Sequence, residues 1–352
     1  MTEQAKSLSY RDAGVDIDAG ARAVELMRGA VEKTHGPEVL AGVGAFGGLF
    51  DLGGIGEDKP VLVASADGVG TKSMIATQVG KLRGLGHDLV NHCVNDILVQ
   101  GARPLFFLDY VASSKLAPEA VADVVTGCAE ACAENGCALL GGETAEMPGV
   151  YRDGELDIVG TIVGVVSRET IIDGSRIRPG DAVIGLASDG LHTNGFSLAR
   201  RALADADLGE RMTDSRTLAD HLLAPHRSYL RDIQLLLSGD DKRRGVDIKG
   251  LVHITGGGLI DNPPRVLPEG TAMWLVRNNW HVPEVFERIR EAGNIALAEM
   301  DRVFNVGLGM LVIVPDRDAE RALALLDRID MAQSWAVGQI TERGDGAPVV
   351  IS

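Results

Sequence analysis

A short apolar run that ends in an acidic, glycine-rich turn constrains this chain more than any other feature. Residues 61–72 are Val-Leu-Val-Ala-Ser-Ala-Asp-Gly-Val-Gly-Thr-Lys, which predicts a buried β-strand followed by a turn. Open α/β sheets bind ligands at the carboxyl ends of their strands. Asp67 can hold a divalent cation through oxygen. Gly68 and Gly70 let backbone N–H groups approach a phosphate, and Lys72 adds positive charge. An ordinary strand-to-helix turn with an Asp cap fits the same residues equally well.

Size and charge limit the classes of protein that the chain can represent. Its 352 residues suffice for roughly two domains, and its 44 glycines far exceed the average share of ~7%. The net charge of −16 argues against a nucleic-acid or anionic-membrane partner. It leaves a phosphorylated substrate open, because nucleotides bind through local N–H groups and metal ions. The first residues carry no apolar leader, so we expect a cytoplasmic protein with no membrane partner.

Three of the four cysteines lie within ten residues, which raises the question of a zinc site. Residues 118–134 predict a helix with Cys128 and Cys132 on its apolar face. The chain contains no Cys-x-x-Cys pair. We therefore expect buried core cysteines.

The segment from residue 86 to residue 98 predicts a helix with unusual polar rows. One face is apolar, and the other carries two rows of short side chains, His87, Asn91 and Asn95, then Asp88, His92 and Asp96. A solvated helix face usually carries Glu, Lys and Arg. Short oxygen donors suit Mg²⁺, so the pattern favours a binding site over a solvated face.

Two more apolar runs end in carboxylates. Residues 104–110 end in Asp109-Tyr110, and residues 138–140 lead into Gly-Gly-Glu143. Together with the first run, these strands are expected to deliver Asp67, Asp109 and Glu143 to one edge of a sheet.

The second half of the chain contains two further glycine-rich strand ends. Residues 181–195 align with residues 61–72 at a constant offset, so that the pattern Asp-Gly-x-x-Thr coincides, with His192 at the position of Gly70 and Asn194 at that of Lys72. Residues 251–259 predict a strand followed by three glycines that begin a short helix. The N-terminus of such a helix favours anion binding. His253 in this segment fits a site residue and a core histidine equally well.

Residues 42–48 formally match the pattern Gly-x-Gly-x-x-Gly. The dinucleotide fingerprint needs a strand before it and a helix after it, whereas a predicted helix and Pro37 precede this segment. We interpret residues 42–54, including Gly44 and Gly47, as a glycine-rich lid that closes over phosphates. The alternative is a permanently ordered turn packed around Phe46, Leu49 and Phe50.

Taken together, the motifs resemble the phosphoribosylformylglycinamidine cyclo-ligase (AIR synthetase) family. They are DGVGTK (67–72), GHDLVNHCVNDILVQGA (86–102), PLFFLDY (104–110), GGETAEMPG (141–149), SDGLHTNGFSL (188–198), HLLAPHRSYL (221–230), HITGGGL (253–259) and FNVGLGM (304–310). The resemblance runs in order from residue 7 to the last strands.

The resemblance implies a two-domain α/β fold, with an ATP-binding and dimerisation domain over residues 1–170 and a substrate-binding domain over 171–352. It implies a homodimer whose N-terminal sheets pair into a barrel, and an ATP- and Mg²⁺-dependent closure of formylglycinamidine ribonucleotide to aminoimidazole ribonucleotide. The implied metal ligands are Asp67, Asp96 and Glu143. The implied catalytic residues are Lys72, His192 and His253. The implied ATP and phosphate contacts are Gly44, Gly47, Gly68, Gly70, Thr71, Lys72, Asn95, Thr193, Asn194, Gly256 and Gly257.

Other readings conflict with particular residues. A selenophosphate synthetase is expected to carry a reactive cysteine near its start, whereas the first cysteine here is Cys93. A hydrogenase maturation dehydratase is expected to end in a cysteine tail, and thiamine monophosphate kinase-like proteins to lack SDGLHTNG and HLLAP. A non-catalytic nucleotide-binding regulator is expected to have lost Asp67, Lys72, Asp96 or Glu143, and all four are present.

Overall fold

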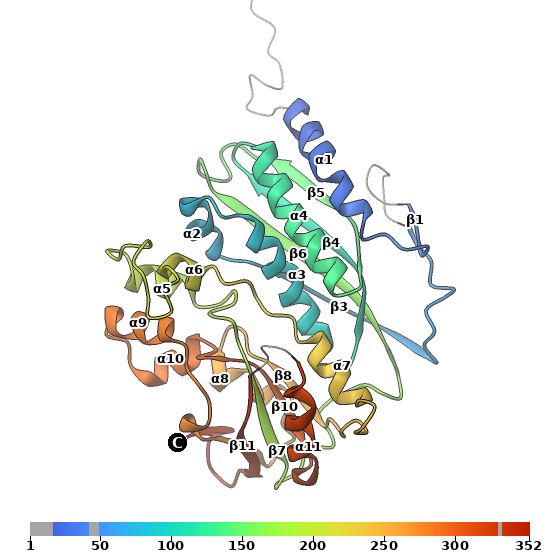
Figure 1. Cartoon of the computed structure of the whole chain (residues 1–352), viewed down its shortest axis with the longest axis vertical. Coiled ribbons are helices and arrows are strands. Elements are labelled where there is room, and N and C mark those ends of the chain that lie inside the picture. The colour runs from blue at the N-terminus through green and yellow to red at the C-terminus, as the bar shows by residue number, and fades with distance from the viewer. Residues whose placement is uncertain (1–16, 42–48, 330–332) are drawn as a thin grey trace, which may run out of the picture. The chain divides into compact units, whose positions relative to one another are not determined.

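Three β-sheets organise the part of the chain that the structure describes, residues 17–41, 49–329 and 333–352 (Figure 1). In this computed structural model the chain divides into two units. The first comprises Met1–Ile55, Ala66–Val90 and Leu105–Ile162, and the second comprises Gly56–Ser65, Asn91–Pro104 and Val163–Ser352. Some helices and strands therefore begin in one unit and end in the other. The boundary predicted at residue 170 stays a prediction.

A four-stranded sheet contains the first glycine-rich turn. Its strands, in spatial order, are β3 (Pro60–Gly68), β6 (Leu156–Ser167), β4 (Arg103–Ser113) and β5 (Ala138–Glu146). The strand predicted from residue 61 is confirmed as β3, but its predicted burial is wrong, because Leu62 is 56% exposed. The reason is that β3 is an edge strand, paired on one side only.

Four helices and a small hairpin complete the N-terminal elements. They are α1 (Ile17–Glu32), α2 (Lys72–Val79), α3 (Arg83–Leu98), α4 (Pro118–Glu134), and the pair β1 (Val39–Ala41) and β2 (Leu49–Phe50). The helices predicted over 86–98 and 118–134 are both confirmed. Cys128 and Cys132 are fully buried, as expected, and Cys93 and Cys137 are buried as well.

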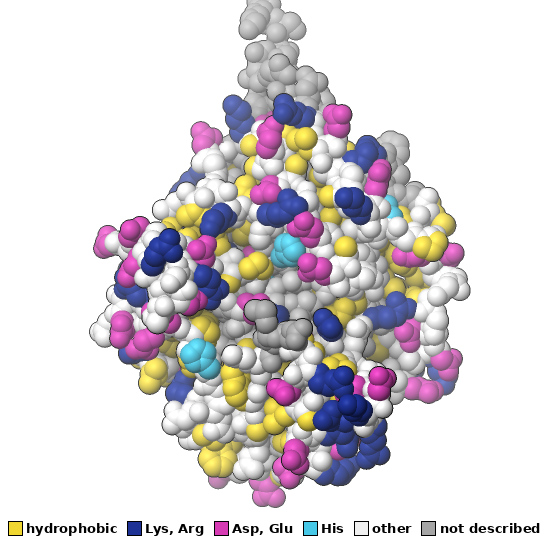
Figure 2. Space-filling view, viewed as in Figure 1, with side chains coloured by type: hydrophobic (Ala, Val, Ile, Leu, Met, Phe, Trp, Pro, Cys, Tyr) yellow, Lys and Arg dark blue, Asp and Glu magenta, His cyan; other side chains and the backbone are white. Residues whose placement is uncertain are grey.

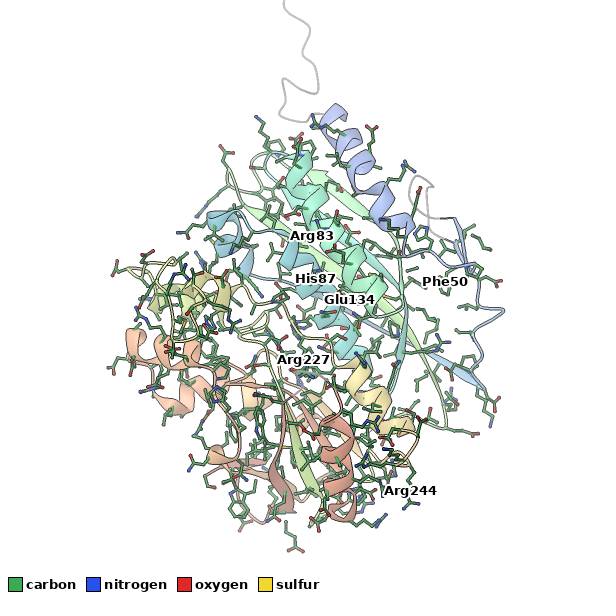
Figure 3. All side chains as sticks on the ribbon, in the orientation of Figure 1. Phe50, Arg83, His87, Glu134, Arg227 and Arg244 are labelled. Atoms are coloured by element: carbon green, nitrogen blue, oxygen red, sulfur yellow. The ribbon has the colours of Figure 1, made fainter. Side chains whose placement is uncertain are left out.

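Helices α3 and α4 approach each other closely, and Figure 1 shows both across one face of the sheet. A Cβ atom on Gly86 would lie 2.2 Å from the Val124 carbonyl oxygen, and one on Gly127 would lie 2.0 Å from that of Arg83. Only glycine permits this separation of backbones. Figure 3 shows Arg83 and His87 of α3 beside α4, where both bind Glu130.

The opposite face of the four-stranded sheet is partly exposed. Along β4 the buried side chains alternate with half-exposed ones, and the half-exposed set includes Phe106 and Leu108. On β6, Val159 has the same half-exposed character. A sheet that packs on one face only shows this alternation, and here the second face is apolar rather than polar.

A six-stranded sheet forms the core of the second unit. Its order is β12 (Val349–Ile351), β9 (Thr271–Leu275), β11 (Ser334–Glu342), β7 (Ala182–Ala187), β10 (Leu308–Val314) and β8 (Gly250–His253). All neighbours are antiparallel except β12 and β9. Every residue of β10 is buried, and this strand is paired on both sides, with β7 and with β8.

Short helices fill the connections of this unit. They are α5 (Phe196–Ala202), α6 (Leu218–Leu222), α7 (Leu230–Ser238), α8 (Gly258–Asp261), α9 (Glu284–Gly293), α10 (Leu297–Val303), α11 (Asp316–Leu326) and the 3₁₀ helices Pro263–Arg265 and Arg277–Asn279. Among the described residues, no helix is both long enough and apolar enough to cross a bilayer.

Candidate active site

Four histidines and one aspartate come together inside the second unit. His92 and Asp96 lie one turn apart on α3, and His253 ends β8. His192 lies on the loop between β7 and α5, and His226 on the loop before α7. These residues are separated by up to 161 positions, so only the fold brings them together. All four imidazoles are buried.

Asp96 and His253 form the central pair. The Nδ1 atom of His253 lies 2.8 Å from Oδ1 of Asp96, and Oγ of Ser65 donates to Oδ2 at 2.9 Å. Burial opposes the charged form of Asp96, but the hydrogen bond and charge of His253, with smaller effects of His92 and Ser65, hold its pKa below the ordinary value. An ionised Asp96 fixes the proton of His253 on Nδ1, so that Nε2 can accept a proton.

The remaining contacts close the cluster into a ring. Nε2 of His253 lies 3.0 Å from Nε2 of His226, whose Nδ1 is 3.4 Å from Oγ1 of Thr193. The same hydroxyl lies 2.6 Å from Nδ1 of His92, and Nε2 of His92 lies 3.7 Å from Oδ2 of Asp96. Each imidazole thus has an oxygen or nitrogen partner that orients it.

His192 lies against this ring rather than within it. Its imidazole stacks on that of His226 with centroids 4.0 Å apart and planes 21° apart. Its φ of 61° is in the left-handed region, which non-glycine residues rarely occupy outside functional loops. The backbone N–H of Asp189 donates to its Nε2 at 3.3 Å.

Two asparagines of α3 hold the loop that carries His226. Asn91 donates to the His226 carbonyl at 2.7 Å. Asn95 donates to the Arg227 carbonyl at 2.8 Å and accepts from the Tyr229 N–H at 2.9 Å. The solvated-face alternative is therefore wrong for Asn91 and Asn95, which are buried and hydrogen-bonded. The predicted nucleotide contact of Asn95 stays a prediction.

The two glycine-rich loops of the second unit lie side by side. A Cβ atom on Gly256 would lie 3.3 Å from Oδ1 of Asn194. A pocket of about 350 Å³ is lined by Gly195, Gly256, Gly257, Asp261, Glu299, Arg302 and Val303. The short helix predicted after the glycines is confirmed as α8. Arg302 donates to Asp261 at 3.2 Å, so its charge at this pocket is shared with a carboxylate.

Lys72, in the first unit, is fully buried. Its Nζ atom lies 2.7 Å from Oδ1 of Asp88, which is buried as well. Burial lowers the pKa of Lys72, and the charge and hydrogen bond of Asp88 oppose this shift. The charge of the Lys72 ammonium is thus already neutralised by a carboxylate. The predicted phosphate contact requires the ammonium to be shared between Asp88 and the phosphate, and it stays a prediction.

The three strand-borne carboxylates lie on three different strands of the four-stranded sheet, and their predicted delivery to one edge of it stays a prediction. Asp67 and Glu143 lie on β3 and β5, the two edge strands, roughly 14 Å apart at three strand spacings. Both are exposed, whereas Asp109 of β4 is buried, and burial raises its pKa to about 7. Asp109 lies opposite Gly142, and Tyr110 lies opposite Glu143.

The other predicted contacts have mixed placements. Gly70 has a φ of 55°, a left-handed conformation that suits glycine, and Thr71 precedes α2 without capping it. The N–H of Gly68 donates to the Asp67 carboxylate at 2.6 Å. Gly44 and Gly47, with most of the predicted lid, lie outside the described residues.

Comparison with known proteins assigns the family. The description "AIR synthase related protein, N-terminal domain" matches residues 48–166, and the corresponding C-terminal domain matches residues 178–351. The chain belongs to the AIR synthase related protein family. It is 46% identical to a phosphoribosylformylglycinamidine cyclo-ligase of Oceanobacillus iheyensis over 95% of this chain and 96% of the relative. It is 48% identical to that of Syntrophotalea carbinolica over 99% of both chains.

Solved structures share the fold of this chain. Hydrogenase maturation protein HypE in complex with ATP superposes with a TM-score of 0.67 at 20% identity, covering 97% of this chain and 93% of that one. Thiamine-monophosphate kinase from Stenotrophomonas maltophilia superposes with a TM-score of 0.65 at 15% identity, covering 94% and 96%. The predicted two-domain α/β fold is confirmed, while the dimer barrel stays a prediction.

Two members of the histidine cluster carried no predicted role. In the sequence, His92 lies in a polar row of the predicted helix, and His226 lies within the motif HLLAPHRSYL. A single histidine in a loop has no periodic signal. The indication available from sequence was that His92 lies four residues before Asp96 on a predicted helix, and therefore on the same face.

Proposed function

We propose that the protein is an ATP-dependent cyclo-ligase that converts formylglycinamidine ribonucleotide to aminoimidazole ribonucleotide, with release of ADP and phosphate. The observation that carries this proposal is the 46–48% identity to cyclo-ligases over nearly the full chain. The Asp96–His253 pair is proposed to supply the proton acceptor that ring closure needs.

The chemistry requires one phosphoryl transfer and one ring closure. The formyl amide oxygen attacks the γ-phosphorus of ATP, and ADP leaves. The amidine nitrogen then attacks the activated carbon, and the carbon–oxygen bond breaks as phosphate departs with that oxygen. The attacking nitrogen gives up a proton. Activation of this kind depends on positioning and on charge stabilisation rather than on a covalent nucleophile.

His253 is the residue that we assign as the acceptor of this proton. Asp96 holds its Nδ1 proton, which leaves Nε2 basic, and His226 lies 3.0 Å from that nitrogen. His192, stacked on His226, is the second candidate for proton transfer. Thr193, Asn194, Gly256 and Gly257 lie on the adjacent loops and are proposed to bind the substrate phosphate or ribose.

ATP and Mg²⁺ are proposed to bind at the first glycine-rich turn. Exposed carboxylates of the kind provided by Asp67 and Glu143 are the donors that Mg²⁺ prefers. Asp96, the third predicted ligand, accepts hydrogen bonds from His253 and Ser65, and its contact with Mg²⁺ stays a prediction. Bound Mg²⁺ supplies charge neutralisation at the phosphates. Within one chain the strand order separates Asp67 from Glu143, so one ion reaches both only if a second copy supplies one of them.

A homodimer meets this requirement. The half-exposed apolar face of the four-stranded sheet, which includes Phe106 and Leu108, needs a partner. Closing two such sheets into one barrel also pairs their edge strands. We propose that β3 of one copy pairs with β5 of the other, which brings Asp67 beside the second copy's Glu143. The cytoplasm stays the predicted location.

The test compares ATP turnover with and without formylglycinamidine ribonucleotide. The proposal predicts ADP release that depends on this nucleotide and is matched by aminoimidazole ribonucleotide. ADP release without it indicates another ATP-using member of the family. ATP binding with no turnover under either condition indicates a non-catalytic regulator.

A further inference from the structure

The loop that carries His192 is fixed at the point where it leaves β7. We call residues 188–195 the histidine loop. The carbonyl of Ala187, the last residue of β7, accepts from the Tyr229 hydroxyl at 2.8 Å and from Nη1 of Arg227 at 3.0 Å. Tyr229 is fully buried, and the guanidinium carbon of Arg227, which is labelled in Figure 3, lies 4.9 Å from the centroid of its ring. A buried phenol and a guanidinium thus hold the carbonyl from which the loop departs.

The side chain of Asn305 holds the histidine loop at two further points. The hydroxyl of Ser188 donates to Oδ1 of Asn305 at 2.9 Å, and Nδ2 of Asn305 donates to the Gly190 carbonyl at 2.9 Å. The Gly307 N–H donates to the same Oδ1 at 2.9 Å, and its carbonyl accepts from the Ser188 N–H at 2.9 Å. Asn305 is buried. One amide therefore ties the loop to residues 304–310, the motif FNVGLGM, for which the proposed function gives no role.

The backbone of this motif has an unusual conformation. Val306 has a φ of 41°, which is a true outlier for a β-branched residue, and its carbonyl accepts from Nε1 of Trp280 at 3.0 Å. Such strain persists only where the surrounding structure imposes it, and it is concentrated at functional sites. A Cβ atom on Gly309 would lie 1.9 Å from the Tyr229 hydroxyl and 2.6 Å from Cε1 of His192. Gly309 thus leaves the space in which these two side chains lie together.

His192 is the residue whose geometry depends on this support. Its Nε2 accepts from the Asp189 N–H at 3.3 Å, so a neutral ring carries its proton on Nδ1. Its ring stacks on that of His226 with centroids 4.0 Å apart. Histidine side chains are scarce on the face of the molecule that Figure 2 draws, and His192 is itself buried. A shift of the histidine loop changes the donor to this ring and its stacking together.

We propose that Tyr229 and Asn305 are positioning residues for His192. They hold the histidine loop in the conformation that stacks this imidazole on His226 and keeps its proton on Nδ1. A displacement of about 1 Å in a catalytic group can lower a rate by ~100-fold, so loss of either support reduces kcat. This effect on turnover rests on the proposed function, in which His192 is a candidate for proton transfer, whereas the effect on the ring does not.

Two conservative substitutions test the proposal by kinetics. Tyr229→Phe removes only the hydroxyl, and Asn305→Asp keeps an acceptor oxygen but cannot donate to the Gly190 carbonyl. Each is expected to lower kcat for aminoimidazole ribonucleotide formation by about 10–100-fold and to leave the KM for ATP unchanged. In a His192→Gln background neither substitution is expected to lower kcat further, because both act through this ring.

Tyr151→Phe is the matched control. It removes a tyrosine hydroxyl that donates to Oδ2 of Asp157 at 2.9 Å, outside the histidine loop and its supports. It is expected to retain the kcat of the wild type. Circular dichroism checks that each variant is folded.

Nuclear magnetic resonance of the full chain with ¹⁵N-labelled histidine provides a measurement that does not depend on turnover. The wild type is expected to show His192 with its proton on Nδ1, its signals being assigned by their loss in His192→Gln. Tyr229→Phe and Asn305→Asp are expected to show a mixture of the two tautomers, because the Asp189 N–H no longer bonds to Nε2. The signals of His281, which is exposed, are expected to stay unchanged.

Additive losses of kcat in the double variants overturn the proposal, because they show that the supports do not act through His192. An unchanged kcat or an unchanged His192 tautomer in the folded Tyr229→Phe variant overturns it as well. A wild type that does not convert formylglycinamidine ribonucleotide refutes the proposed function, and the tautomer measurement then still decides whether Tyr229 and Asn305 position this ring.

Discussion

Removing one partner of the buried Lys72–Asp88 pair should destabilise the protein far more than removing both. The Nζ–Oδ1 distance is 2.7 Å, and both side chains are fully buried. At this distance the attraction amounts to about 6 kcal/mol at an effective dielectric constant of ~20. Desolvation of the two ions costs several kcal/mol each, so the intact pair contributes little net stability.

The single variants leave one charge buried without its partner. Lys72→Met and Asp88→Leu, both close in shape to the native residue, should each lower the free energy of unfolding by about 3–5 kcal/mol. The double variant should lie within about 1 kcal/mol of the wild type. Urea unfolding followed by circular dichroism measures all four proteins, and the double-mutant cycle isolates the interaction.

Additive losses in the double variant would refute this reasoning, because they would show that the two charges do not compensate each other. The double variant also separates stability from function. If it is as stable as the wild type but no longer binds ATP, the Lys72 ammonium is shared with phosphate, as predicted. Unchanged ATP binding assigns Lys72 a purely structural role.

Three further predictions test the packing, the buried carboxyl group and the dimer. Gly86→Ala should lower the free energy of unfolding by about 1–3 kcal/mol, measured by thermal unfolding, because the added Cβ meets the α4 backbone. Gly29→Ala, with open space around it, should be neutral or stabilising. Equal effects of the two substitutions would contradict the close contact between α3 and α4. The folded-state pKa of Asp109 is raised to about 7, so its contribution to stability is fully present below the ordinary pKa of 3.8 and is lost as the pH rises through 7. Over this pH range the free energy of unfolding should fall by about 4 kcal/mol relative to that of Asp109→Asn. Parallel pH profiles for the two proteins would exclude the pKa shift. Asp67→Asn and Glu143→Gln should each be inactive, but unfolding and refolding the two variants together should restore about one quarter of wild-type activity. Half of the refolded dimers are then mixed, and each mixed dimer has one intact site out of two. No recovery of activity would place both carboxylates of a site in one copy.

Local patterns in the sequence predicted the individual elements of the fold well. The helix over residues 118–134 was predicted with its observed bounds, because Pro118 favours the first helical turn and Gly136 follows the end. The strand at residue 61 was predicted correctly, but its exposure was not. Burial depends on which strands pair, and β6, the neighbour of β3, lies about ninety residues further along the chain.

The same limit explains the outcome for the candidate site. Strand-end motifs located Asp67 and Glu143, yet the spatial order β3-β6-β4-β5 that separates them arises from long-range pairing. His226 carried no signal, because its role comes from contacts with His253 and Thr193, which lie on distant segments. Asp96 and His253 were both predicted, but their direct hydrogen bond was not.

In the proposed mechanism, ATP activates the formyl oxygen of the substrate before the amidine nitrogen closes the ring. A substrate labelled with oxygen-18 at the formyl group tests it directly, with mass spectrometry of all products. We expect each turnover to yield one aminoimidazole ribonucleotide and one phosphate that carries the label, while ADP carries none. Unlabelled phosphate, or ATP hydrolysis without the aminoimidazole product, would contradict it.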